Sequence, residues 1–398
     1  MTEAIGHIEF GGFLLSPNVN KPTVELLITI NYPYYSNPKS IKELCIIFVI
    51  FITKLMKYTC SNLNREGKFM KLKKTLFIIP MLLLLVLVGT ACSTSNTSSS
   101  KKTTSSTSFK KTNTNDAKAD PSLSSVTSSV KSDFKQLSYT DKKTGVTLRY
   151  ALYVPKNYDK KTAYPMLTFI PDDSVTGQST ATGITQGYGG SIWATASEQK
   201  KHASFVLIPV FDTSTVSGGF GQFGSSAVKK NVNTYLDLLK SLQKKYNINS
   251  KRLYGTGQSM GGMTMFYINS THPNLFAATL YVSSQWEVSQ LSALKNQKFF
   301  YIAAGGDENA LKGQNNVKSM LKKYKKKYSE ATLDATDSVA KKNTAANKLI
   351  NSKTDANFIT WKTGTVLENS NKGMEHMASF DYGYTIPAVR DWLFNQSK

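Results

Sequence analysis

One serine of this sequence stands where a nucleophile would. Ser259 lies within Gly255-Thr-Gly-Gln-Ser-Met-Gly-Gly262, after an apolar strand pattern and before a run compatible with a helix. On such a tight turn the serine adopts strained backbone, and glycines two residues before and after it remove Cβ clashes. The hydroxyl would then project at the carboxyl edge of a sheet, beside a helix N-terminus that favours an anion. We expect a catalytic nucleophile here; the alternative is a structural glycine-rich turn.

A serine nucleophile needs a general base, and histidine is scarce in this chain. His202 precedes a strand pattern, which places it at the opposite end of the sheet from Ser259. His272 follows Ser259 by 13 residues, roughly 20 Å away along one helix at 1.5 Å per residue. His376 follows the last strand pattern, Phe358–Trp361, in a loop rich in glycine and asparagine. His376 is therefore the expected base, and the alternative is a loop histidine with no special role.

A third group must hold the imidazole in the correct tautomer. Asp307 follows the strand pattern Phe299–Ala304 and two glycines, so its carboxylate should lie at the same sheet edge as Ser259. The alternative is that Asp307 only caps the next helix, with Glu308 as the substitute acid. Asp381 is less favoured because it follows the histidine. The order serine, aspartate, histidine is the one typical of α/β-hydrolases.

The elements that would position these side chains form a repeating pattern. Continuous apolar runs are typical of strands buried on both faces, and helical spacing occurs between them, for example over Val228–Tyr246. The strand patterns are 146–154, 165–170, 204–208, the segment from Arg252, 275–283, 298–304 and 358–361. Strands separated by helices predict an α/β fold with a mostly parallel central sheet and helices on both faces, over residues 134–398. The polar, alanine- and lysine-rich stretch near 310–351 is expected to be a helical insertion.

Further segments of residues 147–398 occur in the order found in one enzyme family. They are Leu152–Tyr158, Pro165–Ile170, Trp193, His202, Phe205–Pro209, Gly257–Gly262, Phe276–Ala278, Gly306–Asp307, His376, Tyr382 and Asp391–Phe394. With them the chain resembles the secreted bacterial esterase and predicted-peptidase branch of the α/β-hydrolases, related to feruloyl esterases and polyhydroxybutyrate depolymerases. The resemblance implies a serine hydrolase that cleaves carboxylic esters through an acyl-enzyme, without a metal or organic cofactor.

One turn departs from that family. Pro171-Asp172-Asp173 stands where the family usually has His-Gly and a small residue. This turn should supply one oxyanion-hole amide, from Asp172, and Met260 should supply the other. Two aspartates beside a developing anion would slow the reaction unless their side chains turn away; an alternative hole lies around Gly187–Gly190. This departure leaves open a catalytically inactive binding lipoprotein at the cell surface. The resemblance itself leaves open a serine peptidase acting on short peptides.

A leader precedes the enzyme-like region. From Met70, lysines are followed by an apolar stretch of 13 residues, Leu76–Val88, and by Gly-Thr-Ala before Cys92. This pattern predicts a lipoprotein-type signal peptide over 70–91, with Cys92 as the lipidated residue. Because a signal peptide works from the N-terminus, we expect residues 1–69 to be a mis-assigned start. The alternative is a real extension with a membrane segment at Leu44–Ile52.

Residues 92–133 are dominated by serine, threonine, asparagine and lysine, and have little to bury. Such a segment cannot offset its ordering entropy, so it is expected to be a disordered tether. It suits an enzyme held at the outer face of the bacterial membrane by a lipid anchor, or a secreted one.

Charge and composition narrow the partners. The chain has 49 Lys+Arg against 26 Asp+Glu, a net charge of +23, and the ten basic and five acidic residues of 1–91 leave +18 on the remainder. Such a charge favours an anionic cell wall or membrane surface. The densest run, Leu321–Tyr328, is expected to be a solvated helix face. Motifs for nucleic-acid binding are absent, and three cysteines with four histidines leave little room for a zinc site. The expected substrate is an ester, with an acylated carbohydrate as the candidate.

Overall fold

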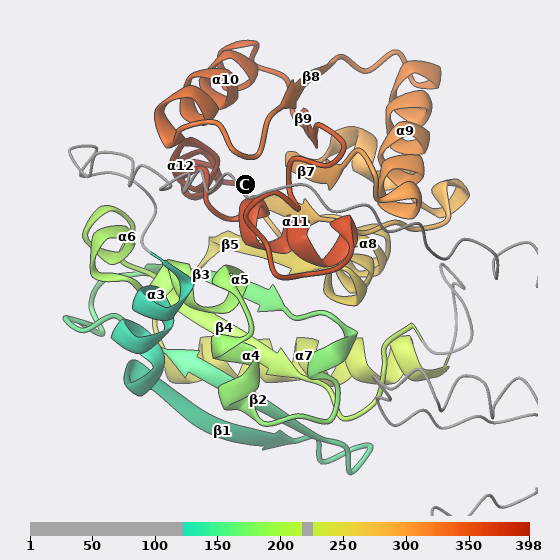
Figure 1. Ribbon diagram of the computed structural model, residues 1–398. Helices are drawn as coiled ribbons and strands as arrows, with labels where there is room; N and C mark the ends of the chain where they lie inside the picture. The colour runs from blue at the N-terminus through green and yellow to red at the C-terminus, as the bar shows by residue number, and fades with distance from the viewer. Residues whose placement is uncertain (1–121, 217–225) are drawn as a thin grey trace, which may run out of the picture. The chain divides into compact units, whose positions relative to one another are not determined.

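Nine strands form one sheet in the computed structural model, which describes residues 122–216 and 226–398 (Figure 1). In spatial order they are β1 (Phe134–Thr140), β2 (Thr147–Tyr153), β4 (Phe205–Val210), β3 (Tyr164–Ile170), β5 (Ile248–Gln258), β6 (Ala278–Val282), β7 (Phe299–Ala304), β9 (Ala356–Trp361) and β8 (Tyr328–Leu333). The β1–β2 and β2–β4 pairs are antiparallel, and the others are parallel. The predicted mostly parallel sheet is confirmed.

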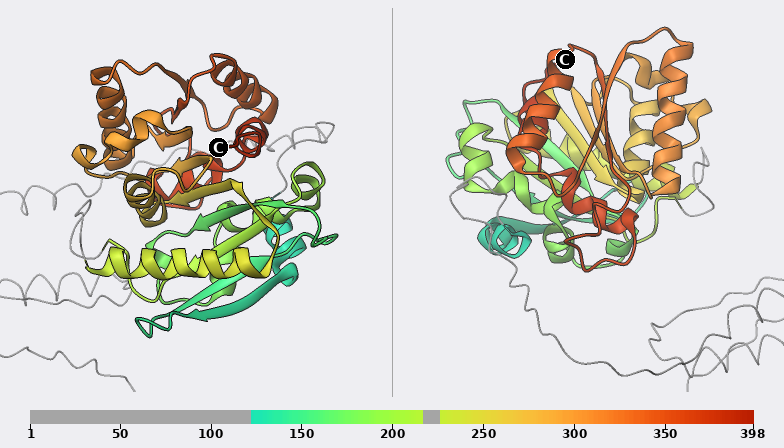
Figure 2. Two further views of the ribbon diagram at one scale, coloured as in Figure 1. Left: turned by 180° about the vertical axis from the view of Figure 1, so that it is seen from behind. Right: turned by 45° about the horizontal axis from the view of Figure 1, so that its top comes forward.

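Helices cover both faces of this sheet (Figure 2). One face carries α7 (Ser226–Lys245), α8 (Met260–Thr271) and α9 (Glu308–Lys323), and α7 runs across the front of the left-hand view. On the other side lie α3 (Leu123–Val130), α4 (Thr180–Thr185), α5 (Tyr188–Ser191), α6 (Ala196–Lys201), α10 (Val339–Asn351), α11 (Glu375–Gly383) and α12 (Pro387–Phe394). Short 3₁₀ turns connect the elements at Lys131–Asp133, Asp173–Val175, Ile192–Ala194, Val288–Gln290 and Ser292–Asn296.

The core is divided by the sheet into two apolar layers. Alternate residues of β4 enter opposite layers: Val206 and Ile208 on the α12 side, Phe205 and Leu207 on the α7 side. Every residue of β4 is buried. This burial on both faces explains why the strands read as continuous apolar runs in the sequence.

The folded region begins earlier than the sequence suggests. The predicted tether runs to residue 133, but Ser122 caps α3 by accepting a hydrogen bond from the Ser125 N–H. Val126 and Val130, four residues apart, each retain only 1% exposure and join the α12-side layer. Two valines on one helical face thus give an otherwise polar segment enough burial to order.

The predicted helical insertion near 310–351 also differs from the structure. It contains α9 and α10, but between them β8 pairs with β9 in parallel register from Tyr328 to Leu333. The segment therefore extends the sheet by one edge strand. The lysine-rich run spans the end of α9, the turn after it and the first residue of β8.

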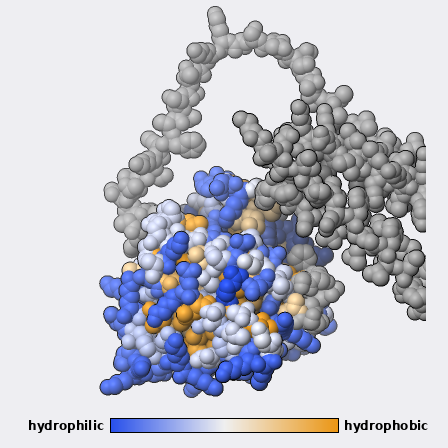
Figure 3. All heavy atoms as spheres, turned by 90° about the horizontal axis from the view of Figure 1, so that it is seen from below, coloured by the Kyte–Doolittle hydropathy of each residue, from blue (hydrophilic) through white to orange (hydrophobic). Residues whose placement is uncertain are grey.

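The opposite edge of the sheet is polar. β1 exposes Lys135, Gln136 and Ser138, and charged or polar edge residues disfavour pairing with a second chain. Seen from below, hydrophilic residues dominate the surface, with apolar patches between them (Figure 3).

Several predictions fall outside the described residues. These are the mis-assigned start over 1–69, the signal peptide over 70–91, the lipidation of Cys92 and the first part of the tether. Within residues 122–216 and 226–398, no helix combines the length and apolar character that a membrane crossing requires.

Replacing Val126 by alanine should test whether α3 belongs to the fold. The loss of two buried methyl groups should lower the free energy of unfolding by about 1.5–2.5 kcal/mol. The exposed Ser125→Ala on the same helix should change it by less than about 0.5 kcal/mol. Denaturant unfolding measures both, and equal stability of the two variants would return this segment to the tether.

Candidate active site

Ser259 occupies a strained turn between β5 and α8. Its backbone angles are φ 48° and ψ −121°, in a region that residues other than glycine rarely adopt. The neighbouring strand helps to hold it there, because the Ser259 N–H donates to the Val282 carbonyl at 3.1 Å. Ser259 also accepts a hydrogen bond from the Met263 N–H at 2.9 Å, which begins α8. The hydroxyl is thus fixed at the carboxyl end of the central strand.

The first turn of α8 lies against the end of β3. A Cβ on Gly261 would stand 1.9 Å from the Ile170 carbonyl oxygen and 2.6 Å from that of Pro171. A Cβ on Gly257 would stand 2.4 Å from the Gly261 carbonyl carbon. These contacts are far inside van der Waals distance, so the turn closes only because both positions lack a side chain.

His376 lies in the first turn of α11 and connects two residues that are distant in sequence. Its Nε2 is 2.9 Å from Ser259 Oγ, and its Nδ1 is 2.6 Å from Asp307 Oδ2. Because a carboxylate only accepts, Nδ1 carries the proton and Nε2 is left to accept from the serine hydroxyl. The imidazole is 28% exposed, whereas the Asp307 side chain is 5% exposed. The three side chains form one hydrogen-bonded chain from a buried carboxylate to an accessible hydroxyl.

Asp307 has two partners. Its Oδ1 accepts from the Ala310 N–H at 3.2 Å and so caps α9, while Oδ2 contacts the imidazole. The capping alternative and the orienting role therefore hold together. Glu308 is exposed in the first turn of α9, and Asp381 forms an ion pair with Lys372 at 2.9 Å.

The turn after β3 holds its aspartate in a buried network. Asp172 is 3% exposed, and its carboxylate accepts from the Ser174 N–H at 3.0 Å and the Gln258 amide at 2.8 Å. The Gln186 amide also donates to this carboxylate. Three hydrogen-bond donors therefore stabilise the negative charge of Asp172. Met260 is the first residue of α8, so its N–H has no acceptor within the helix.

The alternative position for an oxyanion hole is packed into the core. Gly189 and Gly190 belong to α5, where a Cβ on Gly189 would meet the Phe169 ring at 2.4 Å. A Cβ on Gly190 would meet the Gly183 carbonyl oxygen at 2.3 Å. Both glycines are buried against neighbouring elements.

The other two described histidines have structural contacts elsewhere. His202 Nε2 donates to Asp391 Oδ1 at 2.8 Å, and its ring stacks on Phe394. These contacts join the end of α6 to α12. His272 ends α8 beside the Thr271 hydroxyl, and burial lowers its pKa, with a further contribution from Lys240.

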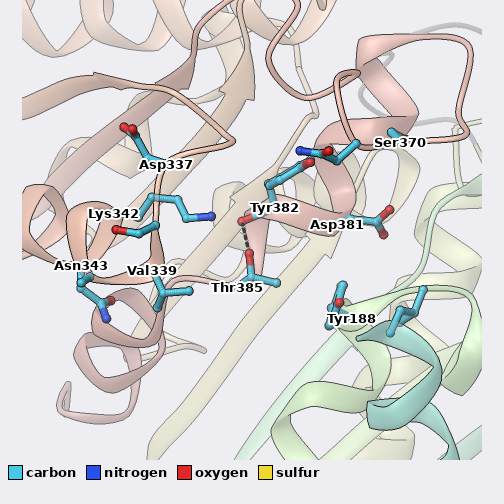
Figure 4. Close-up of a pocket in the computed structure, with 13 residues that line it drawn as sticks. Tyr188, Asp337, Val339, Lys342, Asn343, Ser370, Asp381, Tyr382 and Thr385 are labelled. Carbon is cyan, nitrogen blue, oxygen red and sulfur yellow. Dashed lines mark hydrogen bonds between the residues drawn. The ribbon is translucent and has the colours of Figure 1, made fainter. Parts of the chain in front are cut away.

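A cavity of about 660 Å³ lies on a side of α11 other than the one that carries His376 (Figure 4). Tyr382 and Lys342 face each other across it, with the Lys342 ammonium 5.6 Å from the ring, and Tyr188 approaches from α5. Asp381 and Tyr382 lie five and six residues after His376, so at about 100° per residue they point away from the imidazole. The cavity is thus separate from the Ser259 hydroxyl. In the described ranges no cluster of three or more His, Cys, Asp or Glu is arranged to hold a metal ion.

Sequence reasoning missed the polar residues behind the three side chains. Glu375 is buried directly before His376 and accepts backbone hydrogen bonds from Gly306 at 2.8 Å and Gly364 at 2.6 Å. Gln186 and Gln258 hold Asp172. The only sign in the sequence that Glu375 belongs to the site is its position next to the candidate base. Its hydrogen-bond partners are backbone groups of distant loops, which the sequence does not reveal.

The sheet order, the helices on both faces and the strand–Ser259–helix turn define an α/β-hydrolase. A family model described as "Putative esterase" matches residues 142–367, more than half of the chain, and the chain belongs to this family of esterases. These enzymes are serine hydrolases.

One solved structure shows the same fold. A thermostable esterase has a TM-score of 0.53 and 21% identity, over 68% of this chain and 64% of that one. The chain thus spans just under two thirds of that esterase. The S954A mutant of the feruloyl esterase module from Clostridium thermocellum has a TM-score of 0.44 and 14% identity, over 65% of this chain and 87% of that one. No curated protein matches the chain.

Replacing Gly261 by alanine should disrupt the turn at Ser259. The added methyl would overlap the Ile170 and Pro171 carbonyls, so α8 or the end of β3 must move. We expect a loss of ester hydrolysis of at least about 100-fold, since small displacements of reacting groups cost about that much. Gly373→Ala, at an exposed loop position with open space, is the matched control and should retain activity. Full activity in Gly261→Ala would contradict this packing.

Proposed function

We propose that this protein hydrolyses carboxylic esters through an acyl-enzyme, with Ser259 as nucleophile, His376 as general base and Asp307 as the orienting acid. The observation that carries the proposal is the continuous hydrogen-bond chain between these three side chains, at 2.9 Å and 2.6 Å. The strained backbone of Ser259 supports it, because such conformations persist mainly where function requires them.

The first half of the reaction forms the acyl-enzyme. Ser259 Oγ attacks the ester carbonyl carbon while its proton passes to His376 Nε2, and the Nδ1 proton stays hydrogen-bonded to Asp307. The carbonyl π electrons move onto oxygen, where the Met260 and Asp172 amides and the N-terminus of α8 would stabilise the oxyanion. When the tetrahedral intermediate collapses, the C–O bond to the alcohol breaks. The alcohol leaves with the proton from His376.

The second half restores the serine. Water gives a proton to His376 Nε2 as its oxygen attacks the acyl carbon, and a second tetrahedral oxyanion forms. Collapse breaks the bond to Ser259 Oγ, which recovers its proton from His376, and the carboxylic acid is released. Each proton taken by the imidazole is thus returned within the same half-reaction.

The network around Asp172 favours an enzyme over an inactive binding lipoprotein. An unpaired carboxylate beside a developing oxyanion would oppose it, but this carboxylate already accepts from Ser174, Gln258 and Gln186. The Asp172 carboxylate is thus held by these donors, and the backbone N–H of Asp172 is left to donate to the oxyanion. We therefore propose a working hole formed by Asp172 and Met260. A serine peptidase would use the same groups, with an amine as the leaving group.

Replacing Ser259 by alanine should abolish both covalent labelling and turnover. With p-nitrophenyl acetate, kcat/KM should fall by about 10⁴-fold or more, since the nucleophile and base act as a unit. A fluorophosphonate probe should label the wild type and not the variant. The exposed Ser352→Ala is the matched control, with unchanged rate and labelling.

An unlabelled wild type without turnover would favour the binding lipoprotein. If the wild type is active, paired ester and peptide substrates separate the esterase from the peptidase. We propose that acetylated carbohydrate is cleaved faster than a dipeptide amide of similar size; the reverse preference would favour the peptidase.

We further propose that the enzyme is exported by residues 70–91 and held at the outer membrane face by a lipid on Cys92. The folded part also offers lysines to an anionic surface. They are exposed near the β8 edge, and no acidic side chain of the described ranges forms an ion pair with them: Lys322, Lys323, Lys325, Lys326, Lys327 and Lys348. Three of them line one shallow groove. Wall polymers with phosphate groups, or anionic headgroups, fit this charge.

Cell fractionation with Cys92→Ser tests the location. The wild type should sediment with membranes and yield no peptide from residues 1–69. The variant should lose the membrane anchor but stay bound to the wall at low ionic strength and be released by salt, because salt screens exposed charges. Ser95→Ala, three residues after Cys92, is the control. If Cys92→Ser stays in the membrane fraction, the lipid anchor is contradicted. If its release from the wall does not depend on salt, the lysine surface is contradicted.

A further inference from the structure

Glu375 is a buried carboxylate that no step of the proposed reaction uses. The residue is 8% exposed and stands directly before His376 at the start of α11. Within the described ranges it forms no ion pair; its partners are two backbone N–H groups. Oε2 accepts from Gly306 at 2.8 Å, and Oε1 accepts from Gly364 at 2.6 Å. A buried carboxylate is costly to keep unless such donors compensate it.

These two donors belong to the loops that carry or border the candidate site. Gly306 directly precedes Asp307, in the loop after β7. Gly364 lies in the turn after β9, on the path toward His376. The Glu375 carboxylate therefore links three segments: the backbone next to Asp307, the turn after β9, and the start of α11, which carries His376. Charge-assisted hydrogen bonds of this kind are about twice as strong as neutral ones.

The fit around this carboxylate is close. A Cβ on Gly306 would stand 2.3 Å from Glu375 Oε1 and 2.5 Å from its Cδ. The backbone of the Asp307 loop can thus reach the carboxylate only because residue 306 is glycine. Two connections then set the 2.6 Å distance between Asp307 Oδ2 and His376 Nδ1. One is this side-chain contact itself, and the other is the hydrogen bond between the neighbouring residues, Gly306 and Glu375.

We propose that Glu375 is a positioning residue that fixes the distance and angle between the Asp307 carboxylate and the His376 imidazole. Its effect on rate rests on the proposed function, whereas its effect on the Asp307–His376 hydrogen bond does not. Glu375→Gln is the informative change, because the amide keeps the shape but turns an NH₂ group toward one of the two N–H donors. One loop then loses its acceptor and shifts.

The first measurement needs no substrate. In proton NMR, the His376 Nδ1 proton held by Asp307 should give a low-field resonance in the wild type that is absent in His376→Gln. In Glu375→Gln the resonance should broaden beyond detection or move upfield as the hydrogen bond lengthens. Glu368→Gln, at an exposed carboxylate in the same loop, is the matched control and should keep the wild-type signal.

The second measurement is the division of the kinetic effect. With p-nitrophenyl acetate, kcat of Glu375→Gln should fall about 10- to 100-fold, since sub-ångström misplacement of the base affects the transition state. KM should stay within about threefold, because Glu375 touches no part of the candidate substrate site. A general loss of folded protein would instead lower the active fraction and leave the resonance of the remaining folded molecules unchanged.

An unchanged low-field resonance in folded Glu375→Gln would overturn the proposal, as would an unchanged kcat in an active enzyme. If the resonance changes as expected but the wild type cleaves no ester, the proposed function fails and the positioning role stands. If Glu375→Gln does not fold, Glu375→Asp replaces it: the shorter side chain keeps the charge but cannot reach both donors, and the same two readouts apply.

Discussion

The close approach of α8 to the end of β3 is the constraint on which the rest of the site depends. With glycine at position 261, the first helical turn lies against the Ile170 and Pro171 carbonyls, and Ser259 is forced into its positive-φ conformation. The strain is held by ordinary backbone hydrogen bonds to β6 and within α8. Since the backbone defines where the hydroxyl points, the other site residues are needed only to meet it there.

Parallel strands bring those residues to the same edge. β5 ends directly before the serine, β7 ends three residues before the acid, and the loop after β9 leads to the histidine. Residues separated by 117 and 69 positions thus become neighbours. Asp307 serves this arrangement twice, as the cap of α9 and as the partner of the imidazole. A side chain fixed by a helix cap has little freedom left, which lowers the entropy lost when it orients the histidine.

The sequence was sufficient for those parts of the molecule whose signal is local. Strands such as β4 are apolar throughout because both faces are buried, and the glycines around Ser259 encode the turn directly. It failed for α3, whose serines and threonines resemble a disordered segment and whose order comes from tertiary burial of two valines. It failed for β8 because a partly exposed edge strand lacks a clear period. The supports at Asp172 and Glu375 were invisible, since their partners are groups in distant loops.

The most direct test of the account is to identify the residue that carries the acyl group. The wild type would be quenched with acid during turnover of p-nitrophenyl acetate, digested and analysed by mass spectrometry, beside His376→Ala treated in the same way. The account predicts acetylation of the peptide that contains Ser259 in the wild type and almost none in the variant. Turnover without an acetylated Ser259, or an equal adduct in both proteins, would contradict it.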